Sequence, residues 1–566
     1  MHVKITTSGG RRYVQLVESY RDDAGRVKKR TVATLGRLDQ LDGGLDSVIN
    51  GLLKATGRGL LPEAPAAPTV SFESARALGD VWTLTELWKS LGFSEMRRVF
   101  RRTRHTIDVE VLVRVMVFNR LCDPDSKLGV LRWLEPVALP EVDVKTITHQ
   151  HLLRSMDALI DQQEAVDRVV AGLLRPMIDQ DLSVVFYDLT TIRAEGLSAQ
   201  ENDVREFGMA KEGLIARQFM LGVVQTAEGL PIHHEVFDGN TAETKTLLPT
   251  LKTVLARFPS VKRLVLVADR GLLSLDNLEA LDELRRASGR ALEFILAVPG
   301  RRYQEFAELL DEFHWAQCQP ATTEVIDEMK WNALRLIVAH DPQRAALHTQ
   351  RRDEQINALV KQGEQWVGKF DEQDEGVRRR GRKLSDSGAK ARFFHAVSEA
   401  HLSKIIKVDL KSELFSHDID ESARRLANMM DGKLLLVTNT RDLAAQEVVT
   451  RYKSLADIER GFKVLKSELE IGPVYHRLPE RIRAHAAICF MALILYRVMR
   501  QRLKTANASL SPERALEYLR RIQHHQIRLN ASEPVTGVSA INAEQSELLN
   551  ALNVKKPVAP QQLALL

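Results

Sequence analysis

The stretch from residue 182 to 299 constrains the fold most, because it alternates strand-like and helix-like runs in one order. The run LSVVFYDLT (182–190) is apolar and β-branched, as in a buried strand, and two more strand-like runs follow by residue 239. A helix with a Thr cap, the strand KRLVLVADRG (262–271), another helix and the strand LEFILAVP (292–299) come next. This order, β-β-β-α-β-α-β, predicts an α/β fold on a mixed five-stranded sheet with flanking helices.

Two aspartates stand where this series favours chemistry. Asp188 follows SVVFY inside a buried strand, where an ion is costly unless it is paired or coordinated. Asp269 follows RLVLVA at the C-terminal end of another strand, the edge at which α/β sheets bind ligands. Taken singly, either residue is more simply explained as a helix cap or a turn former.

A third acid, Glu459, lies in YKSLADIERGFKVLKSEL (452–469), which is predicted to form one amphipathic helix. Its simplest explanation is an i,i+4 charge pair with Lys463. Together with Asp188 on the first strand and Asp269 after the fourth, however, a Glu on a late helix gives the layout of an RNase H-like nucleic-acid-cutting core. Carboxylates in such a core hold two divalent ions roughly 4 Å apart. Mg²⁺ suits them because it prefers hard oxygen ligands, and Mn²⁺ is a possible substitute.

The spacing within this helix predicts a functional face. Tyr452, Glu459 and Lys466 are seven residues apart, so on one helix they share a face that drifts only about 20° per step. The Tyr can stack or hydrogen-bond, the Glu can bind metal and the Lys can neutralise phosphate.

Several blocks resemble DDE transposases of the IS4 superfamily, most of all the IS1634-type group. They are FYDLTTIRAEG around Asp188, FGMAKEG (207–213), LVADRGLLS around Asp269, the 452–495 segment and the amino-terminal YVQLVESYRDDAGRVKKRTVATLGRL. The resemblance spans nearly the whole chain. It implies a transposase that binds insertion-sequence ends, cleaves DNA and joins 3′-OH ends to target DNA. It also implies that Asp188, Asp269 and Glu459 are the catalytic metal ligands for two Mg²⁺ ions.

The resemblance further implies DNA contacts around Glu459. The family pattern is a Tyr, two residues, an Arg, three residues, the Glu, six residues and a Lys; Tyr452 and Lys466 match it, whereas Leu455 stands in the Arg position. A basic neighbour could replace that Arg, and basic residues of the following block also match the family, where they either contact DNA or orient the active site. These candidates are Arg451, Lys453, Arg460, His476, Arg481 and His485.

The rest of the chain divides by composition. A polar, alternating start predicts a β-hairpin, and a Pro/Ala linker separates it from a helical region. The predicted domains are an N-terminal hairpin region (1–60), a helical, DNA-binding domain (70–180), the RNase H-like core in two parts (181–300 and 431–505), an insertion between them (301–430) and a helical tail (506–566).

Composition excludes several classes. With 80 Lys+Arg against 75 Asp+Glu, the net charge of +5 permits nucleic-acid binding without demanding it. Three widely spaced cysteines argue against a disulfide framework and for a reducing compartment. The longest apolar run (486–496) is too short to cross a bilayer and is predicted to be a buried core helix. We therefore expect a cytoplasmic protein with no membrane partner, and the resemblance to insertion-sequence transposases implies association with the bacterial nucleoid.

The expected partners are double-stranded DNA, as terminal inverted repeats and target, and a second copy of the chain in a DNA-bound homodimer; the resemblance implies both. Two alternatives stay open: an RNase H-like endonuclease without strand transfer, and a non-catalytic, domesticated DNA-binding protein. The presence of all three acids argues against the second. The sequence lacks G-x-x-x-x-G-K-[ST], which argues against an NTPase.

Overall fold

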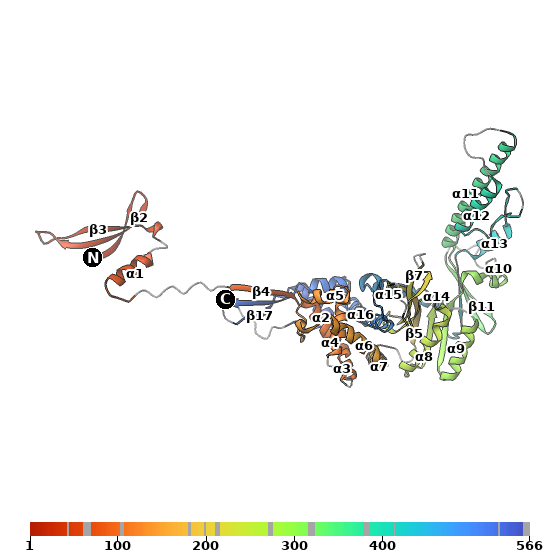
Figure 1. Ribbon diagram of the computed structural model, residues 1–566, viewed down its shortest axis with the longest axis horizontal. Helices are drawn as coiled ribbons and strands as arrows, with labels where there is room; N and C mark the ends of the chain where they lie inside the picture. The colour runs from red at the N-terminus through yellow and green to blue at the C-terminus, as the bar shows by residue number, and fades with distance from the viewer. Residues whose placement is uncertain are drawn as a thin grey trace. The chain divides into compact units, whose positions relative to one another are not determined.

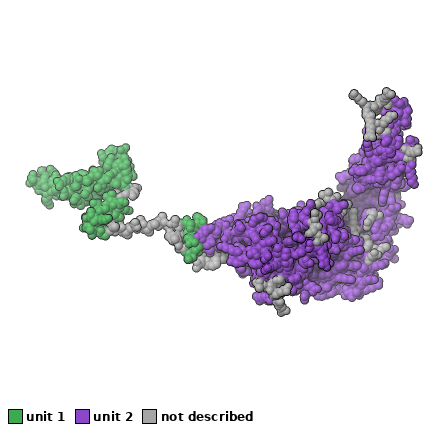
Figure 2. Space-filling model, viewed as in Figure 1, with its two compact units in different colours: residues 1–72, 527–535 green, residues 73–526, 536–566 purple. Residues whose placement is uncertain are grey.

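The computed structural model divides the chain into two compact units (Figure 2). One comprises residues 1–72 and 527–535, and the other residues 73–526 and 536–566. The residues that the structure describes are 1–41, 45–59, 70–101, 107–178, 183–196, 200–209, 215–269, 275–314, 323–376, 385–411, 414–529 and 533–557.

The first unit contains an antiparallel sheet in the order β1-β2-β3 (Figure 1). The hairpin expected from the sequence joins β2 to β3, and β1 adds a further strand. Its turn is closed by the Asp22 carboxylate, which accepts the backbone N–H groups of Ala24 and Arg26 at 3.1 and 2.9 Å. The elements are β1 (His2–Ser8), β2 (Arg11–Arg21), β3 (Val27–Arg37) and α1 (Leu45–Ala55).

The second unit begins with helices that pack around α16 (Pro479–Thr505), which contacts α4 and α6. Among the described residues, α16 is the one helix long and apolar enough to cross a membrane, but 89% of its apolar window is buried inside the protein. It is therefore a core helix, as the sequence predicted. The helices of this region are α2 (Gly79–Leu91), α3 (Met96–Phe100), α4 (Val109–Cys122), α5 (Lys127–Leu134), α6 (His149–Asp161) and α7 (Gln163–Leu174).

A large mixed sheet follows, in the order β11-β12-β15-β10-β9-β5-β7-β6, with β8 also paired to β7. The strands predicted from the sequence lie in the order β8-β7-β5-β9-β10. The β5–β7 and β7–β8 pairs are antiparallel, whereas β5–β9 and β9–β10 are parallel. The strands are β5 (Ser183–Arg193), β6 (Glu206–Met209), β7 (Ile215–Thr226), β8 (Pro231–Asp238), β9 (Arg263–Ala268) and β10 (Ala291–Ala297). The intervening helices are α8 (Leu247–Arg257) and α9 (Leu275–Ser288).

The sheet is wider than the five strands expected. Beyond β10, β15 (Lys433–Thr438) pairs antiparallel, and β12 (Leu334–His340) and β11 (Val325–Trp331) extend it further. The reason is that β12 and β15 are apolar strands far apart in sequence, so their pairing leaves no local signal. Two strands assigned to the predicted insertion thus continue the main sheet.

Between β12 and β15 the chain forms a small hydrophobic core of its own, which includes Phe393 and Phe415. Trp366 meets these rings edge-on, with centroids 6.0 and 5.8 Å away, so it serves core packing. The elements here are α11 (Pro342–Asp374), α12 (Asp386–Glu399), β13 (Ile406–Val408), β14 (His417–Ile419) and α13 (Glu421–Met430); α10 (Ala307–Phe313) precedes them.

The chain after residue 506 is not wholly helical, although the sequence predicted a helical tail. It holds α17 (Pro512–Leu519) and α18 (Ala543–Ala551), but also β16 (Gln523–Leu529) and β17 (Val535–Val538). These strands join β4 (Val70–Ala77) in a sheet of order β17-β16-β4. Again the pairing joins distant segments, which sequence periodicity does not indicate.

Candidate active site

The register between β5 and β9 brings the two predicted aspartates together. The last paired residues of these parallel strands are Tyr187 and Ala268. Asp188 and Asp269 come next on each strand, and adjacent strands lie about 4.8 Å apart. Asp188 is half-buried and Asp269 is exposed. The backbones of Asp188 and Asp269 are therefore adjacent at the C-terminal end of β9.

Hydrogen bonds hold each aspartate. The hydroxyl of Tyr452, on α14 (Ala445–Lys453), donates to Asp269 Oδ1 at 2.8 Å. The backbone N–H of Leu189 donates to Asp188 Oδ1 at 2.7 Å. Because α14 packs against β9 and β10, Tyr452 reaches the strand end across the sheet. The structure thus joins Tyr452 directly to one of the predicted acids.

The segment 452–469 is not the single helix that the sequence predicted. Helix α14 ends at Lys453, α15 (Ala456–Lys463) starts after a turn at Ser454 and Leu455, and Val464–Glu468 form a π-helix. Leu455 packs half-buried against the core at this turn. The prediction of one continuous helix through Tyr452, Glu459 and Lys466 is therefore wrong, because the turn and the wider π-helical turn change the rotation per residue.

Helix α15 carries Glu459 and packs against β5, the strand of Asp188. The Glu459 side chain lies outside the part of the chain that the structure describes. Close packing depends on Gly461, where an added Cβ would come within 2.6 Å of Gln225 Nε2 and 3.0 Å of Arg497 Nη2. The backbone bearing the predicted third acid therefore lies beside the strand bearing the first.

The predicted DNA contacts fall in different surroundings. Lys453 forms an ion pair with Glu324 at 2.6 Å, and Arg481 binds both carboxylate oxygens of Asp157 at 2.8 and 2.9 Å. Arg460 and Lys466 are exposed. Arg451 is paired with Glu447 on its own helix, so the structure singles out no replacement for the Arg that the family places at Leu455.

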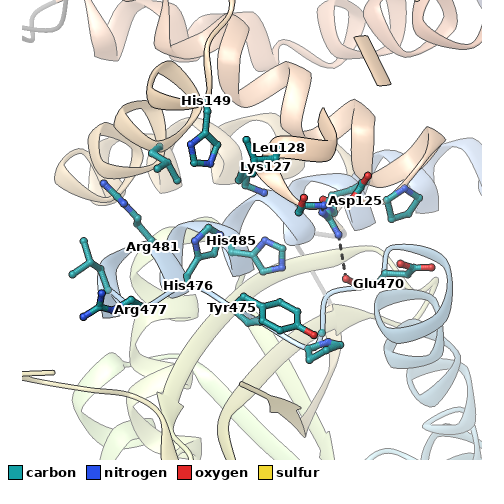
Figure 3. Close-up of a pocket in the computed structure, with 18 residues that line it drawn as sticks. Asp125, Lys127, Leu128, His149, Glu470, Tyr475, His476, Arg477, Arg481 and His485 are labelled. Atoms are coloured by element: carbon teal, nitrogen blue, oxygen red, sulfur yellow. Dashed lines mark hydrogen bonds between the residues drawn. The ribbon is translucent and has the colours of Figure 1, made fainter. Parts of the chain in front are cut away.

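His476 and Arg481 line a cavity of about 530 Å³ whose lining includes neither aspartate. Figure 3 shows Lys127 and His149 facing His476 and His485 across it. Burial, followed by the charge of Lys127, lowers the pKa of His476 to about 3. Sequence reasoning missed Lys127 and Arg120, which come from a region more than 300 residues before the His476 block and carry no motif of their own.

The two aspartates supply suitable donors for a divalent ion. Their carboxylate oxygens are the hard ligands that Mg²⁺ and Mn²⁺ prefer. Among the described residues, no group of three His, Cys, Asp or Glu side chains is placed to hold a metal. Glu459 remains the candidate third ligand, since its backbone adjoins β5.

Comparison with known proteins identifies the family. Residues 2–66 match the IS1634 family transposase, N-terminal domain, and residues 179–495 match the Transposase DDE domain. A solved structure titled "Cryo-EM structure of piggyBac transposase synaptic complex with hairpin DNA" aligns with a TM-score of 0.38 and 8% identity, covering 78% of each chain. A search of the curated proteins finds no match. Because the DDE domain match covers more than half of the chain, the protein belongs to the IS1634-type DDE transposases.

Proposed function

We propose that this transposase binds the ends of its insertion sequence, cleaves DNA phosphodiesters there and joins the 3′-OH ends to target DNA. Family membership supports DNA as the substrate and a divalent metal ion as the cofactor. One observation supports cleavage and joining at a single site. Asp188 and Asp269 follow the last paired residues of two parallel strands, Tyr452 binds Asp269, and α15 packs against the strand of Asp188.

We assign Asp188, Asp269 and Glu459 as the residues that hold two Mg²⁺ ions, for which Mn²⁺ can substitute. When bound, such a pair activates water and stabilises the leaving 3′-oxygen. The strand order β8-β7-β5-β9-β10, with acids on the two central parallel strands, supports an RNase H-like core for this part of the sheet.

The protein's own residues hold this site in one geometry. The Tyr452 hydroxyl orients the Asp269 carboxylate, and the Leu189 N–H orients that of Asp188. Rigid strands under both acids limit their movement, which matters because small displacements of reacting groups cost large factors in rate. Hydrolysis frees a 3′-OH; its oxygen then bonds to a target phosphorus while the target's own 3′-oxygen leaves. No covalent enzyme intermediate is needed.

The flanking basic residues are proposed to bind DNA. Arg460 and Lys466 are exposed on the segment that follows Tyr452, where they can reach a phosphate. We propose that Lys453, His476 and Arg481 also bind DNA. To do so, Lys453 and Arg481 must leave their carboxylate partners or share them with a phosphate. Two DNA ends are joined in one reaction, so we propose that two copies of the chain act together as a homodimer.

The test uses the inverted repeats that flank the gene as DNA substrates. Asp188→Asn, Asp269→Asn and Glu459→Gln are each expected to abolish Mg²⁺-dependent cleavage while end binding in EDTA persists. Undiminished cleavage by any one variant contradicts the role of that residue. Precut ends and a target plasmid then separate a transposase from a plain endonuclease, since only a transposase gives joined products.

A further inference from the structure

The cavity between α5, α6 and residues 470–485 contains two buried cations. Lys127 and Arg120 are each only 5% exposed, and both line the cavity. Among the described residues, Lys127 has no hydrogen-bond or ion-pair partner. Arg120 donates to the backbone carbonyls of Asp125 and Glu470, the latter at 3.1 Å, and has no carboxylate partner there. A buried cation without a counter-charge is costly, so this arrangement favours an anionic ligand.

The acids in the cavity wall do not neutralise these charges. The Asp125 carboxylate pairs with Arg132 at 3.2 Å, and Glu470 is exposed. Burial, then the charge of Arg120, lowers the pKa of Lys127 to about 7, and no carboxylate offsets this. The pKa of His485 is held well below its usual range by burial and by Lys127 and Arg120. The cavity therefore has a positive potential.

The cavity is large enough for a nucleotide and is linked to the strand that carries Asp188. Its volume of about 530 Å³ exceeds that of a phosphate and admits the nucleotide attached to it. One wall residue, Val474, donates its N–H to the carbonyl of Arg193, the last residue of β5, at 3.0 Å. Arg193 lies five positions after Asp188, or about 16 Å along the strand. This length equals roughly five steps of duplex DNA.

We propose that this cavity binds one backbone phosphate of the transposon-end DNA, with Lys127 and Arg120 as its charge partners. The inference rests on the proposed function, because it takes the end DNA as the ligand. Free inorganic phosphate has the same chemistry, so the experiment must separate the two sources.

The first measurement is end binding by the full chain in EDTA, followed by fluorescence anisotropy. Lys127→Met removes the amine and keeps an apolar stem, and is expected to weaken binding about tenfold to a hundredfold. The matched control is Lys145→Met at an exposed lysine, for which we expect a change of no more than about twofold. Equal affinity of Lys127→Met and the unaltered protein overturns the proposal.

The second measurement identifies the phosphate. Single methylphosphonates are placed along each DNA strand to remove one charge at a time. At one position the methylphosphonate should weaken binding by the unaltered protein at least as much as Lys127→Met does. At that position its effect should be smaller in Lys127→Met, where only Arg120 remains to pair with the phosphate. Additive effects at every position overturn the proposal. A different result would be that inorganic phosphate raises the melting temperature of the unaltered protein but not of Lys127→Met, while the two proteins bind DNA equally well. The cavity would then bind free phosphate, and the proposal would be overturned.

Folding controls keep the outcome interpretable. Removal of a buried, unpartnered amine should leave the melting temperature unchanged or higher, whereas a structural role predicts a fall. If Lys127→Met does not fold, Leu153→Trp fills the cavity without altering charge and should weaken end binding at least tenfold; unchanged binding contradicts the proposal. Because binding is measured without metal, a failure to cleave DNA would refute the proposed function alone.

Discussion

The strand ends that carry Asp188 and Asp269, here called the acidic edge, differ from the cavity that contains Lys127 and Arg120 in how their charges are accommodated. Asp188 is half-buried and Asp269 is exposed, and each carboxylate accepts a hydrogen bond. Lys127 and Arg120 are buried, and neither has a carboxylate partner among the described residues. Solvated acids cost little in the absence of a ligand, whereas buried cations gain most when an anion arrives. This difference supports the proposed roles of the two aspartates in DNA cleavage and of the cavity in DNA binding.

The largest effect should separate these two regions. Asp188→Asn or Asp269→Asn should reduce the cleavage rate by at least about 10²–10³-fold, because each removes a charge at the proposed reacting centre. End affinity should change little. Lys127→Met should do the reverse, so that cleavage at saturating protein is nearly normal. Single-turnover cleavage over a range of protein concentrations measures both the rate and the affinity. If all of these variants lose rate and affinity to the same extent, the two regions do not have separate roles.

A smaller effect is expected when the hydrogen bond from Tyr452 to Asp269 is removed. Tyr452→Phe keeps the ring and removes the donor to Asp269, the proposed metal ligand. Cleavage should fall by about tenfold to a hundredfold, as is typical when a metal ligand loses its hydrogen-bond partner. End affinity should stay within about threefold. The matched control is Tyr20→Phe in the first unit, which should leave the cleavage rate unchanged. A larger loss of affinity than of rate would show that the hydroxyl serves DNA binding instead.

Packing of α15 gives a third prediction. Gly461→Ala places a Cβ against the buried ends of Gln225 and Arg497, so it should lower the free energy of unfolding by about 1–3 kcal/mol. Cleavage should fall about tenfold, because the backbone of Glu459 shifts relative to β5. Gly368→Ala, on α11 with open space around it, is the control and should raise stability by up to about 1 kcal/mol. Chemical denaturation and the cleavage assay measure both.

The smallest expected effect is a pH dependence of the free energy of unfolding caused by Lys127. The pKa of Lys127 is lowered to about 7 in the folded protein, so between pH 7 and 10 the unfolded chain binds the extra proton. The free energy of unfolding should therefore rise with pH in this window, by up to about 1 kcal/mol per pH unit. Lys127→Met should be more stable near pH 7, and its advantage should shrink toward pH 10. Denaturant titrations without DNA or phosphate test this, and a constant difference contradicts the low pKa.

The parts of the fold with local signals could be predicted from the sequence. Asp188 and Asp269 follow apolar, β-branched runs, and the alternation of elements indicated that both strands belong to one sheet. The turn at Leu455 could not be predicted, because the residues around it keep helical periodicity while the break depends on packing. The pairing of β12 with β15 was missed for the same reason as Lys127: each depends on contact between segments far apart in sequence.

Metal rescue tests most directly whether Asp188 and Asp269 bind the metal ions. Asp188→Cys and Asp269→Cys replace a hard oxygen ligand with a softer thiolate, which accepts Mn²⁺ more readily than Mg²⁺. We expect both variants to be inactive on end DNA in Mg²⁺ and to regain cleavage in Mn²⁺. The ratio of the cleavage rate in Mn²⁺ to that in Mg²⁺ should be at least about tenfold higher for each variant than for the unaltered protein. Full cleavage in Mg²⁺, or no rescue in Mn²⁺ by either folded variant, would contradict the assignment of these two aspartates as metal ligands.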